Sequence, residues 1–237
     1  MHGDERDTTE LVTVVTWNVK FGEQIEAAID LLSAHPMLSG ADALLLQELD
    51  GDGARRIASA LALELHYEPA CVHPQTGREF GNAILSRSPL RDRRVVPLPH
   101  TATISGTRRI AVAATTDLGH DVRLWCTHAE IPVMAPHLRR RQFRTVADVM
   151  RRDPAPMMIL GGDFNTVTRR GVDTVSSMIR AAGLERARLR EDATIRRAGR
   201  PLALDHVFHR GVTPVAAGVV EPGRASDHSA VWFRFRA

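Results

Sequence analysis

Short apolar runs alternate along the chain with longer stretches in which apolar residues recur every three or four positions. The short runs are rich in β-branched residues, which is typical of strands buried on both faces. They predict strands at 11–15, 43–47, 81–86, 109–116, 122–127, 157–161, 205–209 and 229–235. The longer stretches are typical of amphipathic helices. The alternation of the two patterns predicts an α/β fold.

The helical patterns predict four helices, at 23–33, 53–65, 136–152 and 174–182. In the third of these, arginines including Arg139 lie opposite the apolar stripe, which indicates a solvated face. The proline-rich loops are too short to link domains, so we expect one domain over residues 11–237. Residues 1–10 are polar and lack the apolar stretch of a signal peptide, and we expect them to be disordered.

The composition is that of an ordinary globular protein. The 237 residues are 43% hydrophobic and 25% charged, and a chain of this length buries a core without disulfides. No segment approaches the roughly 20 apolar residues of a membrane span, so we expect a cytoplasmic protein. Cys71 and Cys126 form no CxxC pair, which favours two small apolar residues over a disulfide or a thiolate zinc site.

The charge is slightly basic. The formal net charge is +3 and the sequence pI is about 9.5, with Lys20 the only lysine. An excess of arginine is compatible with a polyanionic partner, and it also follows from genome composition. Charge alone therefore does not decide the class of substrate.

Two acidic motifs at strand ends are the most informative feature of the last third of the chain. Asp163 and Asn165 come directly after one apolar run, and Asp227 and His228 come just before another. Folding alone requires neither Asp163 nor Asp227 there. Two carboxylates, an amide and an imidazole at strand ends are typical of a site for a hard cation and a phosphate.

The other predicted strands also end or begin at polar residues. Asn18, Glu48 and His128 follow apolar runs, while Asn82 and Asp205 head them. Each has an ordinary interpretation by itself, such as an Asn that caps a turn or a Glu at the surface. Their repetition indicates that the strand ends share one edge of the fold.

These motifs occur in the order seen in one family. They are Thr16-Trp17-Asn18, Gln47-Glu48, Gly81-Asn82-Ala83-Ile84-Leu85-Ser86, Thr127-His128, Gly162-Asp163-Phe164-Asn165, Leu204-Asp205-His206-Val207-Phe208 and Ser226-Asp227-His228. The chain resembles the endonuclease/exonuclease/phosphatase superfamily, from about residue 12 to residue 235. The resemblance implies the DNase I-like fold, a four-layer α/β/β/α sandwich of two mixed sheets packed face to face with helices outside.

The resemblance also implies a metal site. Glu48 matches the carboxylate that binds the metal, with Asn18 and Asp227 as auxiliary ligands. Mg²⁺ prefers few protein ligands and keeps several waters, so this sparse set suits it. Mn²⁺ is an alternative, because oxygen ligands separate the two ions poorly.

The same resemblance assigns the catalytic residues. Asp163 matches the group that orients or deprotonates the attacking water, and Asn165 an amide donor to a phosphate oxygen. His228 matches a histidine that faces the phosphate, and Asp205 the carboxylate that fixes its tautomer. His128 matches a candidate general acid towards the leaving oxygen.

Two further residues are candidate phosphate ligands. Asn82 matches a family position. Arg109 lies near a position where several branches of the family have an arginine that contacts phosphate. An arginine at the start of a strand is also common without any functional role. Glu79 is either a partner of the acid histidine or a solvated charge. The only tyrosine, Tyr67, is expected at a helix end away from every motif, which argues against the abasic-endonuclease branch.

The function expected is that of a metal-dependent phosphodiesterase acting on nucleic acid or nucleotides. One alternative is a phospholipid or inositol-phosphate hydrolase on the same scaffold. Another is a non-catalytic binding protein, which is disfavoured because every key position keeps its functional side chain. We expect a monomer. In this fold the residues at the shared edge carry out common chemistry, and variable loops select the substrate.

Overall fold

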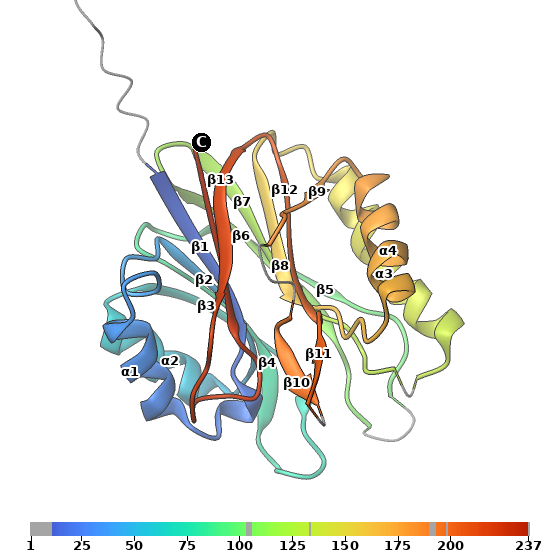
Figure 1. Ribbon diagram of the computed structural model, residues 1–237, viewed down its shortest axis with the longest axis horizontal. Helices are drawn as coiled ribbons and strands as arrows, with labels where there is room; N and C mark the ends of the chain where they lie inside the picture. The colour runs from blue at the N-terminus through green and yellow to red at the C-terminus, as the bar shows by residue number, and fades with distance from the viewer. Residues whose placement is uncertain (1–10, 103–105, 133, 190–192, 198, 237) are drawn as a thin grey trace, which may run out of the picture.

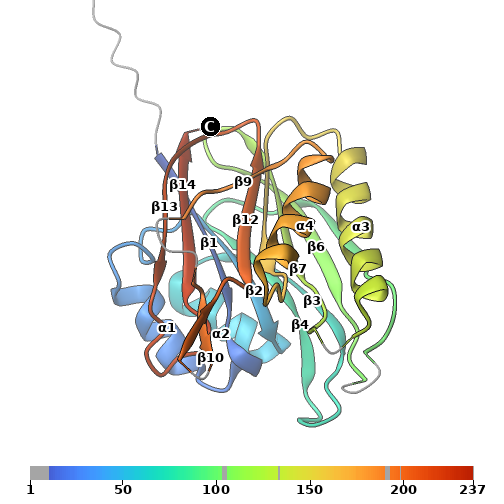
Figure 2. The ribbon, with the colours of Figure 1, turned by 45° about the vertical axis from the view of Figure 1, so that its right-hand side comes forward.

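Two six-stranded sheets pack face to face, and a pair of helices covers the outer face of each (Figures 1 and 2). The computed structural model describes residues 11–102, 106–132, 134–189, 193–197 and 199–236. β1 runs parallel to β2 and antiparallel to β14, and β7 runs parallel to β8 and antiparallel to β6, so both sheets are mixed. The predicted four-layer sandwich is confirmed.

The order of the strands within each sheet differs from their order along the chain. The first sheet contains, from edge to edge, β13 (Thr213–Val220), β14 (Ala230–Arg236), β1 (Leu11–Asn18), β2 (Ala43–Leu49), β4 (Glu79–Ser86) and β3 (Glu64–Val72). The second contains β5 (Arg91–Pro97), β6 (Ile110–Asp117), β7 (Asp121–His128), β8 (Met158–Asp163), β12 (Asp205–Arg210) and β9 (Glu185–Arg186). β10 (Ile195–Arg197) and β11 (Arg200–Leu202) form a separate hairpin.

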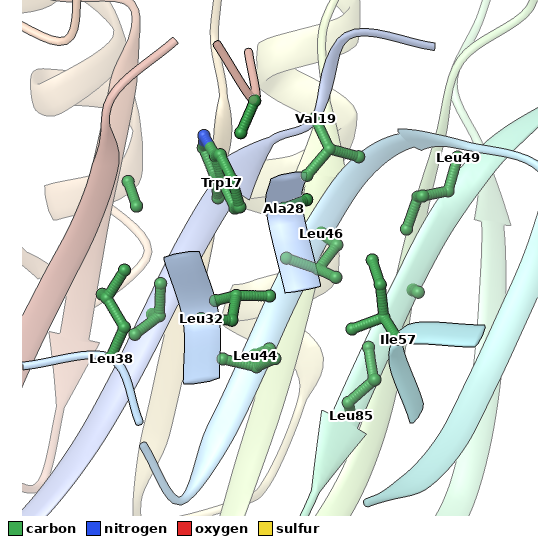
Figure 3. Close-up of a cluster of buried hydrophobic side chains, with 14 of the residues drawn as sticks. Trp17, Val19, Ala28, Leu32, Leu38, Leu44, Leu46, Leu49, Ile57 and Leu85 are labelled. Carbon is green, nitrogen blue, oxygen red and sulfur yellow. The ribbon is translucent and has the colours of Figure 1, made fainter. Parts of the chain in front are cut away.

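The helices connect strands of the sheet that they cover. They are α1 (Ile25–Ala34), α2 (Gly51–Leu61), α3 (Pro136–Arg152) and α4 (Arg169–Arg180), with a short 3₁₀ turn η1 (Lys20–Gly22) after β1. Beneath α1 and α2, Trp17 and Leu44 of the sheet pack in one apolar cluster with Leu32 and Ile57 of the helices (Figure 3). Since the other face of each sheet is buried against its partner, the inner strands need continuous apolar runs.

Two glycines allow the sheets and strands to approach closely at the end of β8. A Cβ atom on Gly161 would lie 2.9 Å from the Thr16 Cβ of the facing sheet. A Cβ on Gly162 would lie 1.9 Å from the Thr127 carbonyl oxygen of the neighbouring strand. Both glycines belong to β8, so their role is close packing next to Asp163 rather than turn formation.

The second helix is shorter than the pattern predicts. It ends at Leu61 because Ala62 adopts a left-handed conformation, with φ 52° and ψ 47°, and β3 begins at Glu64. Tyr67 therefore lies in β3, and its expected place at a helix end is wrong. Its hydroxyl donates to the Leu49 carbonyl at 3.2 Å, directly beside Glu48, so it is also close to a motif in space.

The remaining differences concern edges and termini. The helix predicted at 174–182 begins earlier, at Arg169, where the Thr168 hydroxyl accepts from the Gly171 amide at 3.0 Å. The apolar patterns do not predict β3, β5 and β13, and all three lie at sheet edges. The expected disorder of residues 1–10 lies outside the described residues, and the single domain over 11–237 stays a prediction.

The two cysteines are free thiols, as the sequence predicts. Cys126 is fully buried and Cys71 half-buried. Burial raises the pKa of the Cys126 thiol to about 12, so it is no nucleophile at neutral pH. No helix among the described residues has the length and apolar character needed to span a bilayer.

Candidate active site

The polar strand ends meet at one end of the two sheets, beside the β10–β11 hairpin (Figure 2). Pairing aligns His128 of β7 and Asp205 of β12 with Asp163 of β8. A single bridge joins His228 to Ile195 of the hairpin. Hydrogen bonds and ion pairs then link the residues of both sheets into one site, whose members are Asn18, Glu48, Arg109, His128, Asp163, Asn165, Asp205 and His228.

The amide of Asn18 joins two carboxylates. Its Nδ2 donates to Glu48 Oε1 and to Asp163 Oδ2, at 3.0 Å each, while its Oδ1 accepts from the Lys20 backbone amide at 2.9 Å. In this arrangement Asn18 positions the carboxylates and directs its own oxygen to the backbone. Its service as a metal ligand stays a prediction.

Glu48 is held in an unusual backbone conformation. It lies at a β-bulge between Gln47 and Leu49, with φ 59°, which is rare for a residue with a side chain. Such strain, of order 1–3 kcal/mol, persists where the surrounding structure enforces it and is concentrated at functional sites. The bulge turns Glu48 towards the site, where its side chain is 14% exposed.

The two carboxylates of this donor set fit a hard divalent cation. Ligand atoms of Glu48, His128 and Asp163 all lie within 4.8 Å of one another. Burial raises the pKa of Glu48, against a hydrogen bond from Asn18, and burial with the neighbouring Asp205 raises the pKa of Asp163. A bound cation would offset this cost of holding buried carboxylates together.

Asp227 is less central than the sequence predicts for a metal ligand. It belongs to neither of the potential metal-binding clusters that the described residues form. Its charge contributes to the raised pKa of Glu48, so it lies close enough to act at longer range. Its role as an auxiliary ligand stays a prediction.

His228 and Asp205 form a buried pair that faces Asp163. His228 Nδ1 lies 2.8 Å from Asp205 Oδ2, and its Nε2 lies 3.8 Å from Asp163 Oδ2. Burial lowers the pKa of His228, but the carboxylates of Asp205, Asp163 and Asp227 outweigh this effect and raise it to about 10. The ring is therefore an imidazolium at neutral pH, with Nε2–H directed towards the centre of the site.

Asn165 is fixed by contacts from three directions. Its backbone has φ 52°, its amide N–H donates to Asp163 Oδ1 at 2.8 Å, and its Nδ2 donates to the Ala129 carbonyl at 3.0 Å. The guanidinium of Arg139 donates to the Asn165 carbonyl at 2.9 Å and to the Glu130 carbonyl at 2.9 Å. The expectation that Arg139 lies on a solvated face is wrong, because it is partly buried and supports this loop.

His128 lies against a buried arginine. Arg109 Nη1 is 2.9 Å from His128 Nδ1 and 3.1 Å from Nε2. Burial lowers the pKa of His128 well below its ordinary value, and the positive charge of Arg109 lowers it further. His128 is therefore a neutral imidazole, and Arg109 is part of the site rather than an exposed strand-edge residue.

Glu130 is a residue of the site that the sequence motifs miss. Its two carboxylate oxygens accept from Arg109 Nε and Nη2, both at 3.1 Å, and the side chain is almost fully buried. The available signal is an acidic residue two positions after His128, just beyond the strand end. A buried carboxylate there neutralises Arg109 and fixes the guanidinium beside the imidazole.

The two remaining candidates make structural contacts. Asn82 is buried, and its Nδ2 donates to the Ile110 carbonyl at 3.0 Å, which ties the two sheets together. Its contact with phosphate stays a prediction. Glu79 Oε2 accepts from the Gly51 amide at 3.2 Å, so its described partner is the start of α2 rather than His128.

Comparison with known proteins agrees with this geometry. The sequence model of the endonuclease/exonuclease/phosphatase family matches residues 15–228. The chain belongs to this family. Members of the superfamily hydrolyse phosphoester bonds. The family's match spans Asn18 to His228, and so includes every residue of the site.

Individual relatives cover nearly the whole chain. A UPF0294 protein of Yersinia pseudotuberculosis is 27% identical over an alignment of 238 positions, which covers 99% of this chain and 87% of that protein. An endonuclease/exonuclease/phosphatase from Beutenbergia cavernae is 23% identical, with a TM-score of 0.74 over 95% of this chain and 71% of that one. D. rerio TDP2, solved with a single-strand DNA product, is 17% identical, with a TM-score of 0.77 over 96% and 100%.

Proposed function

We propose that this protein is a divalent-metal-dependent phosphodiesterase that acts on nucleic acid or nucleotides. One observation supports this above the others. The imidazolium of His228 lies 3.8 Å from Asp163, one of the two carboxylates that Asn18 bridges. A cation bound on one side and an imidazolium on the other would neutralise the negative charge that develops on a phosphoryl group during cleavage.

Glu48 would hold the metal ion, with Asp163 and His128 in reach, and Mg²⁺ or Mn²⁺ would supply Lewis-acid stabilisation of the phosphoryl oxygens. Asp163 accepts a proton from the attacking water, a role helped by its raised pKa. The Asn165 amide donates to a non-bridging oxygen. Asp205 accepts from His228 Nδ1–H and so holds the imidazolium with its Nε2–H towards the substrate.

The charge states of the two histidines distinguish their roles. A general acid must carry a proton, and Arg109 together with burial keeps His128 neutral. We therefore assign proton donation to the leaving oxygen to His228. His128 and Arg109 would instead orient the phosphate, with Arg109 as the cationic donor.

Features around the site favour a polyanionic substrate. The β10–β11 hairpin carries three exposed arginines, Arg196, Arg197 and Arg200, and is bridged to His228 through Ile195. Cations on one side of a phosphodiester site attract and align a nucleic acid backbone. D. rerio TDP2, which has the same fold, has been solved with a single-strand DNA product.

The test is turnover of a substrate panel by purified protein with Mg²⁺, with Mn²⁺ or with EDTA. The panel contains plasmid DNA, single-stranded DNA, RNA, bis(4-nitrophenyl) phosphate, sphingomyelin and inositol phosphates. We expect metal-dependent cleavage of nucleic acid, lost in Glu48→Gln. Preferred turnover of the lipid or inositol phosphates would instead identify the alternative hydrolase, and no turnover of any compound would support a non-catalytic binding protein.

A further inference from the structure

A row of aromatic rings leads from the candidate active site to the surface. The Phe80 ring lies 5.7 Å from the His128 ring, between centroids, and 5.6 Å from that of Phe21. His73 completes the cluster, at 4.8 Å from Phe21 and 5.4 Å from Phe80. The Arg109 guanidinium lies 4.9 Å from the Phe80 centroid. Phe21 is thus two ring contacts away from a residue of the site.

The outer end of this row is accessible. Phe80 and His73 are buried, at 4% and 5% exposed, whereas Phe21 is only partly buried. Phe21 belongs to none of the three apolar cores. The buried rings hold it from behind, so an aromatic surface of fixed orientation remains open to a ligand.

The backbone of Phe21 is strained, and packing of its ring in an apolar core does not offset this strain. Lys20, Phe21 and Gly22 adopt positive φ values of 49°, 56° and 59°, in the turn directly after Asn18. A bulky residue in this conformation is a true outlier, and such outliers are found at ligand-binding positions. The Lys20 amide, bonded to Asn18 Oδ1, couples this turn to the residue that bridges the carboxylates.

We propose that Phe21 is the stacking surface for a nucleobase of the substrate, one nucleotide from the phosphate that is cleaved. This inference rests on the proposed function and deepens it. Every nucleobase offers an aromatic face, so stacking on a single ring gives affinity without sequence selection. Arg109 and His128, at the inner end of the row, then contact the phosphate attached to that nucleoside.

The test is a double-mutant cycle in which the Phe21 ring is removed from the protein, one base is removed from the substrate, or both are removed. The substrates are thymidylyl-(3′→5′)-thymidine and two analogues, each with one base replaced by hydrogen. We expect Phe21→Gly to lower kcat/KM for the complete dinucleotide about tenfold, since stacking of one base commonly contributes this much. For the analogue that lacks the stacked base, the same substitution leaves kcat/KM unchanged.

Three variants separate stacking from folding and from general apolar contact. Glycine adopts the left-handed conformation readily, so Phe21→Gly removes the ring while relieving the backbone, and its melting temperature confirms the fold. Phe21→Trp keeps an aromatic ring, and its kcat/KM for the dinucleotide should be close to that of the wild type rather than that of Phe21→Gly. Val72→Ala, which removes a 62% exposed apolar side chain next to His73, leaves it unchanged.

Equal losses on all three dinucleotides, or no loss on the complete one, would overturn the inference while the proposed function stands. If the wild-type protein cleaves none of them, the proposed function fails for these substrates, and binding decides the inference. Calorimetric titration then compares thymidine 5′-monophosphate with deoxyribose 5-phosphate. If Phe21→Gly binds thymidine 5′-monophosphate about tenfold more weakly than the wild type does, but binds deoxyribose 5-phosphate equally well, stacking is supported. If the wild type and the variant bind the nucleotide with equal affinity, the inference is overturned.

Discussion

The side-chain amide of Asn18 donates to Asp163 at 3.0 Å, although the two residues are 145 positions apart and end strands of different sheets. This bond closes the site across the interface between the sheets. The same nitrogen contacts Glu48, so the distance between the two carboxylates depends on one amide. The packing of the sheets and the chemistry of the site are therefore coupled.

Asn18→Ala should lower kcat/KM about 10- to 100-fold, the usual effect of removing a residue that positions a metal ligand. The two carboxylates lose their shared donor and repel each other. Activity would be titrated against Mg²⁺ concentration, and we expect the half-saturating concentration to rise. Wild-type activity and Mg²⁺ dependence in a folded Asn18→Ala protein would contradict the bridging role.

Divalent metal should stabilise the protein measurably, independent of any activity. At a Mg²⁺ or Mn²⁺ concentration one hundred times Kd, binding to the folded state adds about 2.7 kcal/mol and raises Tm. Glu48→Gln should abolish this rise. Glu79→Gln, which alters a carboxylate at the start of α2, is the matched control and should retain it. An equal metal-induced shift in both variants would place the cation elsewhere.

The pairing of Asp205 with His228 predicts a specific pH dependence. The pKa of His228 is raised to about 10, so the imidazolium persists below that pH and activity falls as the pH rises through it. Asp205→Asn removes one of the three carboxylates that raise this pKa, and the only one hydrogen-bonded to the ring. The alkaline limb of the kcat/KM profile should then move towards the ordinary histidine range, near about 6.5. An unmoved limb would exclude His228 as the proton donor.

Gly161→Ala should destabilise the fold by about 1–3 kcal/mol, the usual cost of inserting a methyl group into packed space. The added carbon would lie 2.7 Å from Leu45 Cδ1 and 2.9 Å from Thr16 Cβ, so the sheets must separate. Thermal unfolding measures the loss. Gly40→Ala is the control, since nothing lies within 4 Å of its added carbon. Equal stability of the two variants would show that the sheets tolerate separation.

Glu130→Gln should destabilise the protein by about 3–5 kcal/mol, because Arg109 would remain buried without its counter-charge. Urea unfolding measures this loss. Asp52→Asn breaks an exposed contact with Arg55 and should change stability little. Comparable effects of the two substitutions would show that the Arg109–Glu130 pair is not a stabilising contact.

The sequence predicts the inner strands well, because strands buried on both faces leave long apolar runs. It does not predict β5, whose Arg91-Asp92-Arg93-Arg94 start is polar because that edge faces solvent. The end of α2 differs from the prediction for a local reason. Ala62 takes a left-handed conformation that glycine usually marks, so the helical pattern continues to Leu65 without a stop signal.

The candidate site could be predicted where a functional side chain ends an apolar run and matches a family motif. Asn18, Asp163 and His228 are of this kind, and the structure brings them together. Glu130 lies just beyond the end of a predicted strand and Arg139 in an arginine-rich stretch, and neither position indicates a buried side chain. Their partners are distant in the chain or belong to the backbone, so only the folded structure reveals them.

The position of β1 between β14 and β2 has a consequence for synthesis of the chain. Among the described strands, β1, which carries Asn18, is made first, and its neighbour β14 is made last. His228 directly precedes that last strand. A growing polypeptide therefore holds an incomplete site with one edge of β1 unpaired, and the candidate active site can form only after β14 has emerged from the ribosome.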